Sequence, residues 1–360
     1  MKAHGQTRAR TGAVSRALVL GLALAAAYLL FWPVPIEPES WTPLSAAHPS
    51  AHGGLAGVEL LEASLPAPEA VIFDAEGRIV TGLLDGRIVR FTPNGHDVTV
   101  IAQTGGRPLG LKYDRTGRLI AADAHRGLLA IGPQGNVEIL AAELGGQPLR
   151  LVDDLDVGQD GAVYFSDASA RWPLGAYKMD IIEHRPSGRL LVYRPDRGVE
   201  LLLGGLYFAN GVALAPDASY VLVNETMSYR VRRVYLRGPK AGQHDIFVDN
   251  LPGFPDNITW SPRRRAFWIA LAAPREPAID ALGPWPFARK MIARLPELLQ
   301  PAAKRHARAL AVDEAGRTVA DVQDASPTSY SPLTSVIERD GFLYLGSFVH
   351  HGVGRVRAPQ

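Results

Sequence analysis

A short phrase, made of a polar turn and a strand-forming run, occurs six times along this chain. Each copy has the small or polar residues of a tight turn and then a run of aliphatic, β-branched or aromatic residues. This combination is typical of a hairpin turn that leads into a buried β-strand. The six copies are DAEGRIVTG (74–82), DRTGRLIAAD (114–123), GQDGAVYFSD (158–167), APDASYVLVNE (215–225), SPRRRAFWIA (261–270) and ERDGFLYLGS (338–347).

The spacing of these phrases predicts a six-bladed β-propeller, an all-β fold. The turn positions 77, 117, 161, 218, about 265 and 341 are separated by about 40, 44, 57, 47 and 76 residues. The shorter steps match one four-stranded propeller blade, and the third and fifth steps contain a blade and an insertion. A β-sandwich also has many short strands, but it does not require one phrase to recur at blade spacing.

The N-terminus contains an apolar run long enough for a membrane anchor. Residues 17–36, ALVLGLALAAAYLLFWPVPI, are uncharged and follow four basic residues, Lys2, Arg8, Arg10 and Arg16. As a helix rising about 1.5 Å per residue, the run spans roughly 30 Å, the thickness of a bilayer core. A cleavable signal peptide is the alternative, but no small-x-small cleavage site directly follows the bulky end of the run.

We therefore predict a single-pass, signal-anchored membrane protein with three parts. Residues 1–36 form a basic cytoplasmic tail and a transmembrane helix, residues 37–55 a stalk, and residues 56–360 the propeller. The positive-inside rule places the propeller on the periplasmic or extracytoplasmic side. An insertion at 283–309 contains a helical pattern, Pro286–Arg308, broken by Pro296. We interpret it as a lid or a second membrane contact, or else as a helix packed on the rim.

Composition and absent motifs exclude several kinds of chemistry. The chain has no cysteine, which excludes disulfides, thiolate metal sites and a cysteine nucleophile. The net charge is +2, and four basic residues with no acidic one lie in residues 1–36, so the remainder has a charge of −2 and indicates no nucleic-acid partner. No G-x-S-x-G, H-E-x-x-H, P-loop or dinucleotide-binding motif is present. Nothing in the sequence predicts the oligomeric state.

Oxygen-bearing side chains occupy equivalent places just ahead of several strand phrases. In a propeller this segment is the innermost strand, which lines the central channel. Turn capping is the ordinary role of Asp and Asn, but it does not require one shared place in each repeat. The shared position predicts a hard-cation site, best suited to Ca²⁺ and alternatively to Mg²⁺ or Mn²⁺. The candidate ligands are Glu69, Asp153, Asn210, Asp256 and Asn257, and Asp154 lies beside them.

Four segments resemble the strictosidine synthase-like family. They are LDVGQDGAVYFSDAS (155–169), RPSGRLLVYRPD (185–196), residues 207–258 beginning YFANGVALAPDASYVLVNE, and IERDGFLYLGSFVHHGVGRV (337–356). With the anchor, the layout is similar to the adipocyte plasma membrane-associated protein branch of that family. The wider superfamily includes gluconolactonases and paraoxonases, six-bladed propellers with calcium in the channel. The resemblance implies that Glu69, Asp153, Asn210 and Asp256, with Asn257 beside it, are metal ligands.

Two departures from the family pattern bear on activity. Thr334 stands where strictosidine synthases carry a catalytic Glu, which disfavours their amine–aldehyde condensation, and Leu109 stands where paraoxonases have a His. We therefore expect a metal-dependent hydrolase of esters or lactones, similar to an arylesterase or lactonase, in which Asp154 or Asp256 deprotonates the attacking water. Trp172 and Tyr177 would shape the channel entrance, although rim packing is the alternative for Trp172. The alternative function is a non-catalytic, calcium-stabilised binding propeller, and a condensing enzyme comes third.

Overall fold

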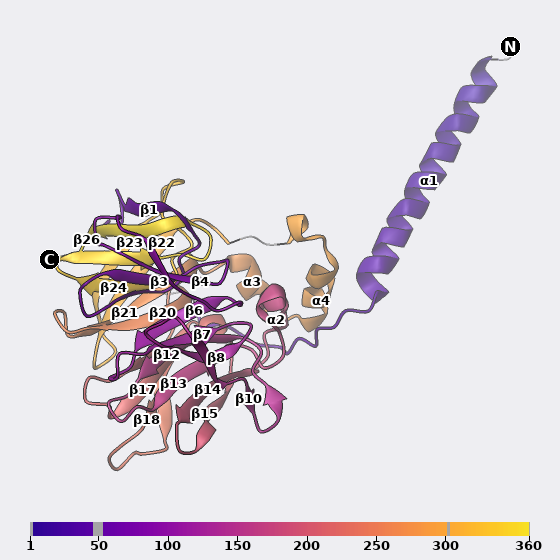
Figure 1. The fold of residues 1–360 in the computed structure, drawn as a ribbon. Coiled ribbons are helices and arrows are strands. Elements are labelled where there is room, and N and C mark those ends of the chain that lie inside the picture. The colour runs from indigo at the N-terminus through magenta and orange to yellow at the C-terminus, as the bar shows by residue number, and fades with distance from the viewer. Residues whose placement is uncertain (1–2, 46–52, 301–302, 360) are drawn as a thin grey trace.

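The second strand of every blade comes from one of the six recurring phrases. The structure is a computed structural model that describes residues 3–45, 53–300 and 303–359, with side chains from Arg16 onward. Within these residues the strands form six four-stranded antiparallel sheets, the blades, and one two-stranded ribbon, β10 (Glu143–Leu144) with β11 (Gln147–Pro148) (Figure 1). The predicted six-bladed β-propeller is therefore confirmed.

The first three blades follow in chain order. The first has β2 (Val71–Phe73), β3 (Ile79–Gly82), β4 (Arg87–Phe91) and β5 (Thr99–Gln103). The second has β6 (Pro108–Tyr113), β7 (Leu119–Asp123), β8 (Gly127–Ile131) and β9 (Val137–Ala141). The third has β12 (Val152–Val157), β13 (Val163–Asp167), β14 (Gly188–Arg194) and β15 (Gly198–Leu206).

The last blade closes the ring with a strand from the start of the propeller. The fourth blade has β16 (Ala209–Leu214), β17 (Tyr220–Glu225), β18 (Arg230–Tyr235) and β19 (His244–Val248). The fifth has β20 (Gly253–Ser261), β21 (Ala266–Pro274), β22 (Ala307–Asp313) and β23 (Thr318–Asp324), and the sixth has β24 (Ser335–Arg339), β25 (Phe342–Gly346) and β26 (His351–Arg357). Strand β1 (Glu59–Pro66) completes the sixth blade, because Glu59 pairs with Arg355 and Leu61 with Val353. This pairing joins the two ends of the propeller in one blade and closes the ring.

The core consists of apolar layers between neighbouring blades. Phe267 of β21 is fully buried and packs with Leu222 and Val231 of the fourth blade and Ile258 of the fifth. Blade strands buried on both faces read as continuous apolar runs, which explains why the recurring phrases were visible in the sequence.

Both predicted insertions are helical and lie at the same end of the propeller. The third blade contributes 3₁₀-helix η1 (Leu174–Ala176) and α2 (Tyr177–Glu183), and the fourth contributes the 3₁₀-helix η2 (Thr226–Ser228). The fifth contributes α3 (Pro277–Leu282), α4 (Pro286–Arg294) and the 3₁₀-helix η3 (Glu297–Leu299). The helical pattern predicted over 286–308 is interrupted at Pro296: α4 ends at Arg294, η3 follows, and Ala307 already belongs to β22.

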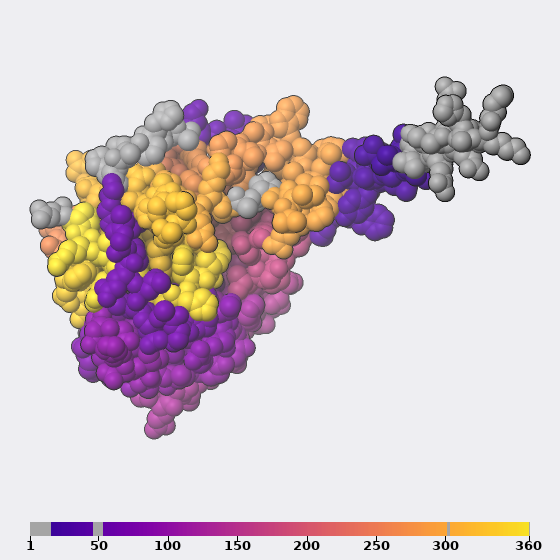
Figure 2. All heavy atoms as spheres, turned by 90° about the horizontal axis from the view of Figure 1, so that it is seen from above, coloured from indigo at the N-terminus to yellow at the C-terminus, as the bar shows by residue number. Residues whose placement is uncertain are grey.

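The N-terminal helix α1 (Ala3–Phe31) projects from the propeller and meets it at α4 (Figures 1 and 2). Arg294 fixes this junction: its Nη1 donates to Leu29 O at 2.8 Å and its Nε to Trp32 O at 2.6 Å. Tyr28 Oη donates to Arg294 O at 3.1 Å. Within the described parts of the chain, no helix meets the length and apolarity needed to cross a bilayer.

Candidate functional site

The candidate ligands of the third, fourth and fifth blades lie at irregularities in the innermost strands, and Glu69 lies just ahead of β2. The register between first and second strands shifts between Val152 and Leu155, between Ala209 and Val212, and between Pro255 and Ile258. These three intervals contain Asp153–Asp154, Asn210–Gly211 and Asp256–Asn257. A β-bulge re-aims side chains that a regular strand would alternate between faces. In these three blades the shared place in the repeat is therefore a shared backbone irregularity.

Glycines let the inner strands approach one another at these points. A Cβ on Gly211 would lie 2.5 Å from both Asp256 O and Ile258 N, and a Cβ on Gly346 would lie 1.8 Å from Glu69 O. Neither distance is compatible with any larger residue unless the backbone moves. The glycine after Asn210 thus brings the fourth blade against the strand that carries Asp256 and Asn257.

A cavity of about 650 Å³ opens above four of the predicted ligands. Glu69, Asp153, Asn210 and Asp256 line it, and each is less than a tenth exposed. Most of its other lining residues are apolar, including Leu151, Ile181, Phe208, Phe254, Ile279 and Leu282. The predicted channel residues Leu109 and Tyr177 also line it. A mainly apolar cavity with a few converging polar groups is the usual form of a small-molecule site.

Asp154 and Asn257 line a second, smaller cavity along the channel. Oδ2 of Asp154 accepts a 2.9 Å hydrogen bond from the Val212 amide. Deeper in the channel, Lys112 Nζ lies 2.9 Å from Oδ1 of Asp156. Of the two predicted bases, Asp256 lines the large cavity and Asp154 does not.

Trp172 and Thr334 are not among the residues that line the large cavity. The indole N–H of Trp172 donates a 2.6 Å hydrogen bond to Oε2 of Glu183, which packs Trp172 against the end of α2 within the third-blade insert. Thr334 is buried, and its Oγ1 donates to Glu69 O at 3.0 Å. The predicted substrate-channel role of both residues therefore has no support in this geometry.

Several buried oxygens in the channel have no hydrogen-bond partner among the described residues. These are Oε2 of Glu69 and the Oδ1 atoms of Asn210 and Asn257. The other Glu69 oxygen, Oε1, accepts a 3.1 Å hydrogen bond from Nδ2 of Asn257. A buried oxygen without a hydrogen-bond partner lowers the free energy of unfolding. Each of these three oxygens therefore points to a partner that the protein chain does not supply.

The carboxylates are held where their negative charges are unfavourable. Burial, and then the nearby charges of Asp256 and Asp153, raise the pKa of Glu69 well above its usual value. Burial and Asp153 do the same to the pKa of Asp256, which a hydrogen bond from Asn210 partly offsets. Burial and Asp154 raise the pKa of Asp153 to about 8. A nearby cation would relieve this repulsion.

The donor chemistry fits an oxygen-preferring divalent cation. Glu69, Asp153, Asn210 and Asp256 offer only oxygen, the donor set of Ca²⁺ and Mg²⁺. In the described residues, however, no three Asp, Glu, His or Cys side chains are grouped as they would be around an ion. The observation that fits a cation site is therefore the presence of buried oxygens on Glu69 and Asn210 that have no hydrogen-bond partner among the described residues.

Two cavity residues were missed by sequence reasoning. Arg107 is 3% exposed and its Nη2 donates to Ala67 O at 2.9 Å, beside Glu69. Its position two residues ahead of Leu109, at the start of an inner strand, was the available signal. Trp41 also lines the cavity but comes from the predicted stalk, where nothing in the sequence indicates a contact with the propeller.

Two family models match different parts of the chain. A strictosidine synthase model matches residues 153–239, and a model of the N-terminal part of strictosidine synthase-like proteins matches residues 54–91. The human adipocyte plasma membrane-associated protein is 34% identical over 354 residues, covering 90% of this chain and 84% of the relative. The Arabidopsis thaliana protein strictosidine synthase-like 6 is 33% identical over 311 residues, covering 84% and 82%.

Solved structures support the fold at low identity. A gluconolactonase from Xanthomonas campestris aligns with a TM-score of 0.61 and 16% identity, covering 91% of this chain and 98% of that one. Regucalcin from Agrobacterium tumefaciens, described as a calcium-binding protein, aligns with a TM-score of 0.58 and 16% identity, covering 85% and 94%.

Proposed function

The chain belongs to the strictosidine synthase-like family, and from this premise we propose that it is a membrane-anchored, metal-dependent hydrolase of esters or lactones. One observation supports this most directly: buried, partly unpartnered oxygens form the polar end of a 650 Å³ cavity whose walls are apolar. The gluconolactonase with the same fold has a related activity in its name.

Glu69, Asp153, Asn210 and Asp256 would hold the cation, for which Ca²⁺ fits best and Mg²⁺ or Mn²⁺ are alternatives. Regucalcin, with the same fold, is described as calcium-binding. When bound, a divalent cation supplies Lewis acidity that polarises a substrate carbonyl. Asn257 holds Glu69 in place through Oε1, and Thr334 holds the Glu69 backbone.

Asp256 is the proposed proton acceptor, because it alone of the two predicted bases lines the large cavity. The apolar walls would bind the acyl or aryl part of the substrate and exclude water from it. Arg107 places a positive charge beside the carboxylates. Thr334 stands where strictosidine synthases carry a catalytic Glu, so the condensing activity is not part of this proposal.

The second candidate is a calcium-stabilised binding propeller without catalysis. It is favoured by Leu109, which lines the cavity at the place where the family resemblance puts a paraoxonase His. Propellers serve both roles, so the fold does not separate them.

Membrane anchoring through the predicted run 17–36 is part of the proposal. Helix α1 would carry the anchor up to Phe31, where it ends, because Ile36 is buried against the propeller. The support is the apolar run and the exposure of its large side chains, such as Leu18, Val19, Leu22 and Leu24, along α1. The expected orientation is a cytoplasmic N-terminus and an extracytoplasmic propeller. Retention of the full chain in the membrane pellet after alkaline carbonate extraction would support the anchor, and release into the supernatant would contradict it.

The first test of activity is hydrolysis of phenyl acetate and a panel of small lactones by the full chain in detergent. We expect turnover that a chelator abolishes and added Ca²⁺ restores. Absence of turnover, with Ca²⁺ still raising the melting temperature, would favour the binding propeller. If there is no turnover and Ca²⁺ leaves the melting temperature unchanged, both candidate functions are contradicted.

A further inference from the structure

Residues 32–45, which we call the strap, are bound to the propeller inserts rather than standing free of them. Ile36 is 1% exposed. The Glu37 amide donates to Oε1 of Glu183 at 2.7 Å, and the Trp41 amide donates to Gly283 O at 3.2 Å. Further along, Arg275 Nη1 donates to Leu44 O at 2.7 Å. The strap thus contacts α2, the loop after α3 and the end of β21.

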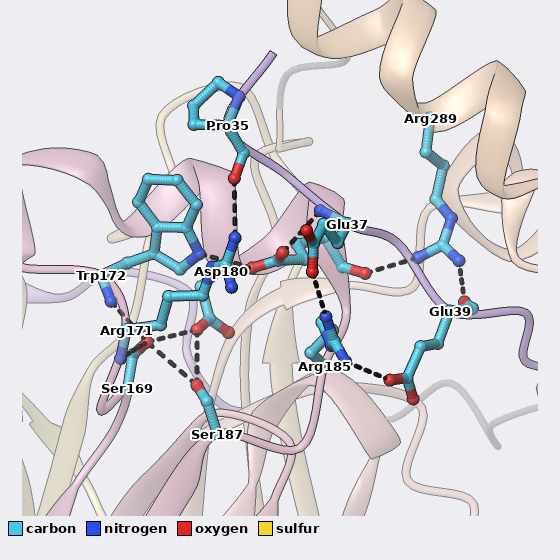
Figure 3. Close-up of polar contacts among 11 residues, drawn as sticks. Pro35, Glu37, Glu39, Ser169, Arg171, Trp172, Asp180, Arg185, Ser187 and Arg289 are labelled. Atoms are coloured by element: carbon cyan, nitrogen blue, oxygen red, sulfur yellow. Dashed lines mark hydrogen bonds and ion pairs between the residues drawn. The ribbon is translucent and has the colours of Figure 1, made fainter.

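Charged side chains reinforce this attachment at its outer edge. Arg171 Nη2 donates to Pro35 O at 2.7 Å, and Arg185 pairs with Glu37 and Glu39, each at 2.8 Å (Figure 3). Glu183 is buried and also accepts the indole N–H of Trp172. Exposed ion pairs contribute little, so the buried contacts hold the strap in register.

One buried arginine joins the strap to two inserts. Arg289 of α4 is 4% exposed, and its guanidinium donates to the backbone oxygens of Ile182, Glu183 and Gly283 at 3.1–3.3 Å. It also donates to Glu39 O on the strap (Figure 3). A single side chain therefore fixes the strap, the end of α2 and the α3–α4 loop relative to one another.

This attachment places Trp41 in the wall of the large cavity. Its indole stacks on the His184 ring, with centroids 4.0 Å apart and planes 8° apart, and tilts against Tyr229 at 6.2 Å. Trp41 is half-buried and lines the cavity with Ile182, Ile279 and Leu282. The backing by His184 leaves the indole rigid, and a rigid aromatic face is a strong apolar contact for a ligand.

We propose that Trp41 is a ligand-contacting residue that the strap supplies to the cavity, and that it determines how large an apolar acyl or aryl group is accepted. The part that concerns acyl groups rests on the proposed hydrolase function. The segment next to the anchor is then a component of the binding site.

The test uses full chains in detergent and the neutral apolar fluorophore N-phenyl-1-naphthylamine as probe. Trp41→Ala should weaken probe binding at least about tenfold, which corresponds to about 1.4 kcal/mol. Trp41→Phe should recover part of the affinity. Ile36→Ala is the matched control, because Ile36 is a buried strap residue that does not line the cavity. Binding is compared at a temperature where circular dichroism shows all variants folded.

A loss confined to Trp41→Ala, with Ile36→Ala within about threefold of wild type, supports the proposal. Equal losses in both variants would show that only strap attachment matters and would overturn direct contact, as would unchanged binding in Trp41→Ala. If the wild-type chain hydrolyses esters, Trp41→Ala should lower kcat/KM more for p-nitrophenyl octanoate than for p-nitrophenyl acetate. A wild-type chain without hydrolysis refutes the proposed function, and the probe titration still decides the role of Trp41.

Discussion

Nδ2 of Asn257 donates a 3.1 Å hydrogen bond to Oε1 of Glu69 and so joins the fifth blade to the first across the channel. These residues are far apart in sequence, and the bond leaves Oε2 of Glu69 and Oδ1 of Asn257 without partners among the described residues. This bond fixes the two side chains relative to each other, while their remaining oxygens stay available for a ligand.

Glu69→Gln should separate the cost of the buried charge from the benefit of a cation. In chelator we expect the variant to be at least as stable as wild type, because an uncharged amide replaces a carboxyl that burial and two neighbouring acids disfavour. Added Ca²⁺ at about 100 times its Kd should stabilise wild type by about 2.7 kcal/mol and the variant by far less. Thermal unfolding in chelator and in calcium measures both effects; an equal calcium shift in the two proteins would rule out Glu69 as a ligand.

Asp256→Asn and Asp154→Asn should differ in activity. Asp256 lines the large cavity, whereas Asp154 faces the smaller one and accepts a hydrogen bond from the Val212 amide. A positioned base contributes roughly 10²–10⁴ to the rate, so we expect a loss of about that size in kcat/KM for Asp256→Asn and less than about tenfold for Asp154→Asn. Phenyl acetate hydrolysis measures both, and the reverse order would reassign the base.

Gly211→Ala should be strongly destabilising. The added Cβ would lie 2.5 Å from Asp256 O and Ile258 N, so the fourth and fifth blades must separate. We expect a loss on the order of 3 kcal/mol in the free energy of unfolding, in the range of severe overpacking. Gly175→Ala is the control, because its Cβ would meet no atom within 4 Å, and it should change stability by less than about 0.5 kcal/mol. Similar urea midpoints for the two variants would contradict the close approach.

His184 should make stability depend on pH below neutrality. Burial, with Arg289 and Arg230 adding to it, lowers the pKa of His184 to about 3, so the folded chain keeps the ring neutral. Below about pH 6.5 the unfolded chain takes up a proton that the folded chain does not, and stability therefore falls as the pH is lowered towards 3.

The measurement compares wild type with His184→Asn in urea at pH 7.5 and pH 5. Asn is suited to the left-handed backbone at this position, where φ is 49°. The stability advantage of wild type should shrink by up to about 2 kcal/mol between the two pH values. An advantage that does not change with pH would mean that His184 is protonated in the folded state.

The sequence by itself determined the blades and most of the candidate site. Strands buried on both faces must be apolar and must be joined by tight turns, so six phrases at blade spacing identified the second strand of each blade. Glu69, Asp153, Asn210 and Asp256 were identified because they recur at one place in that repeat. For Asp153, Asn210 and Asp256 the same place becomes a bulge in the inner strand, and Glu69 lies just ahead of β2. A local sequence pattern is sufficient to predict a residue's place in the fold wherever that residue's environment repeats from blade to blade.

Only the tertiary structure decided which neighbour of each pair faces the large cavity, and which segments cover it. A bulge changes the direction of side chains by backbone geometry that residue type does not specify, so Asp256 and Asp154 were equivalent in the sequence but lie in different cavities. The helical pattern over 286–308 extends beyond the observed helix, because α4 ends at Arg294, ahead of Pro296, and residues from Ala307 onward pair in β22. Trp41 joins the cavity through contacts with residues more than 140 positions away, such as His184 and Gly283, and such long-range contacts leave no periodic signal in the chain.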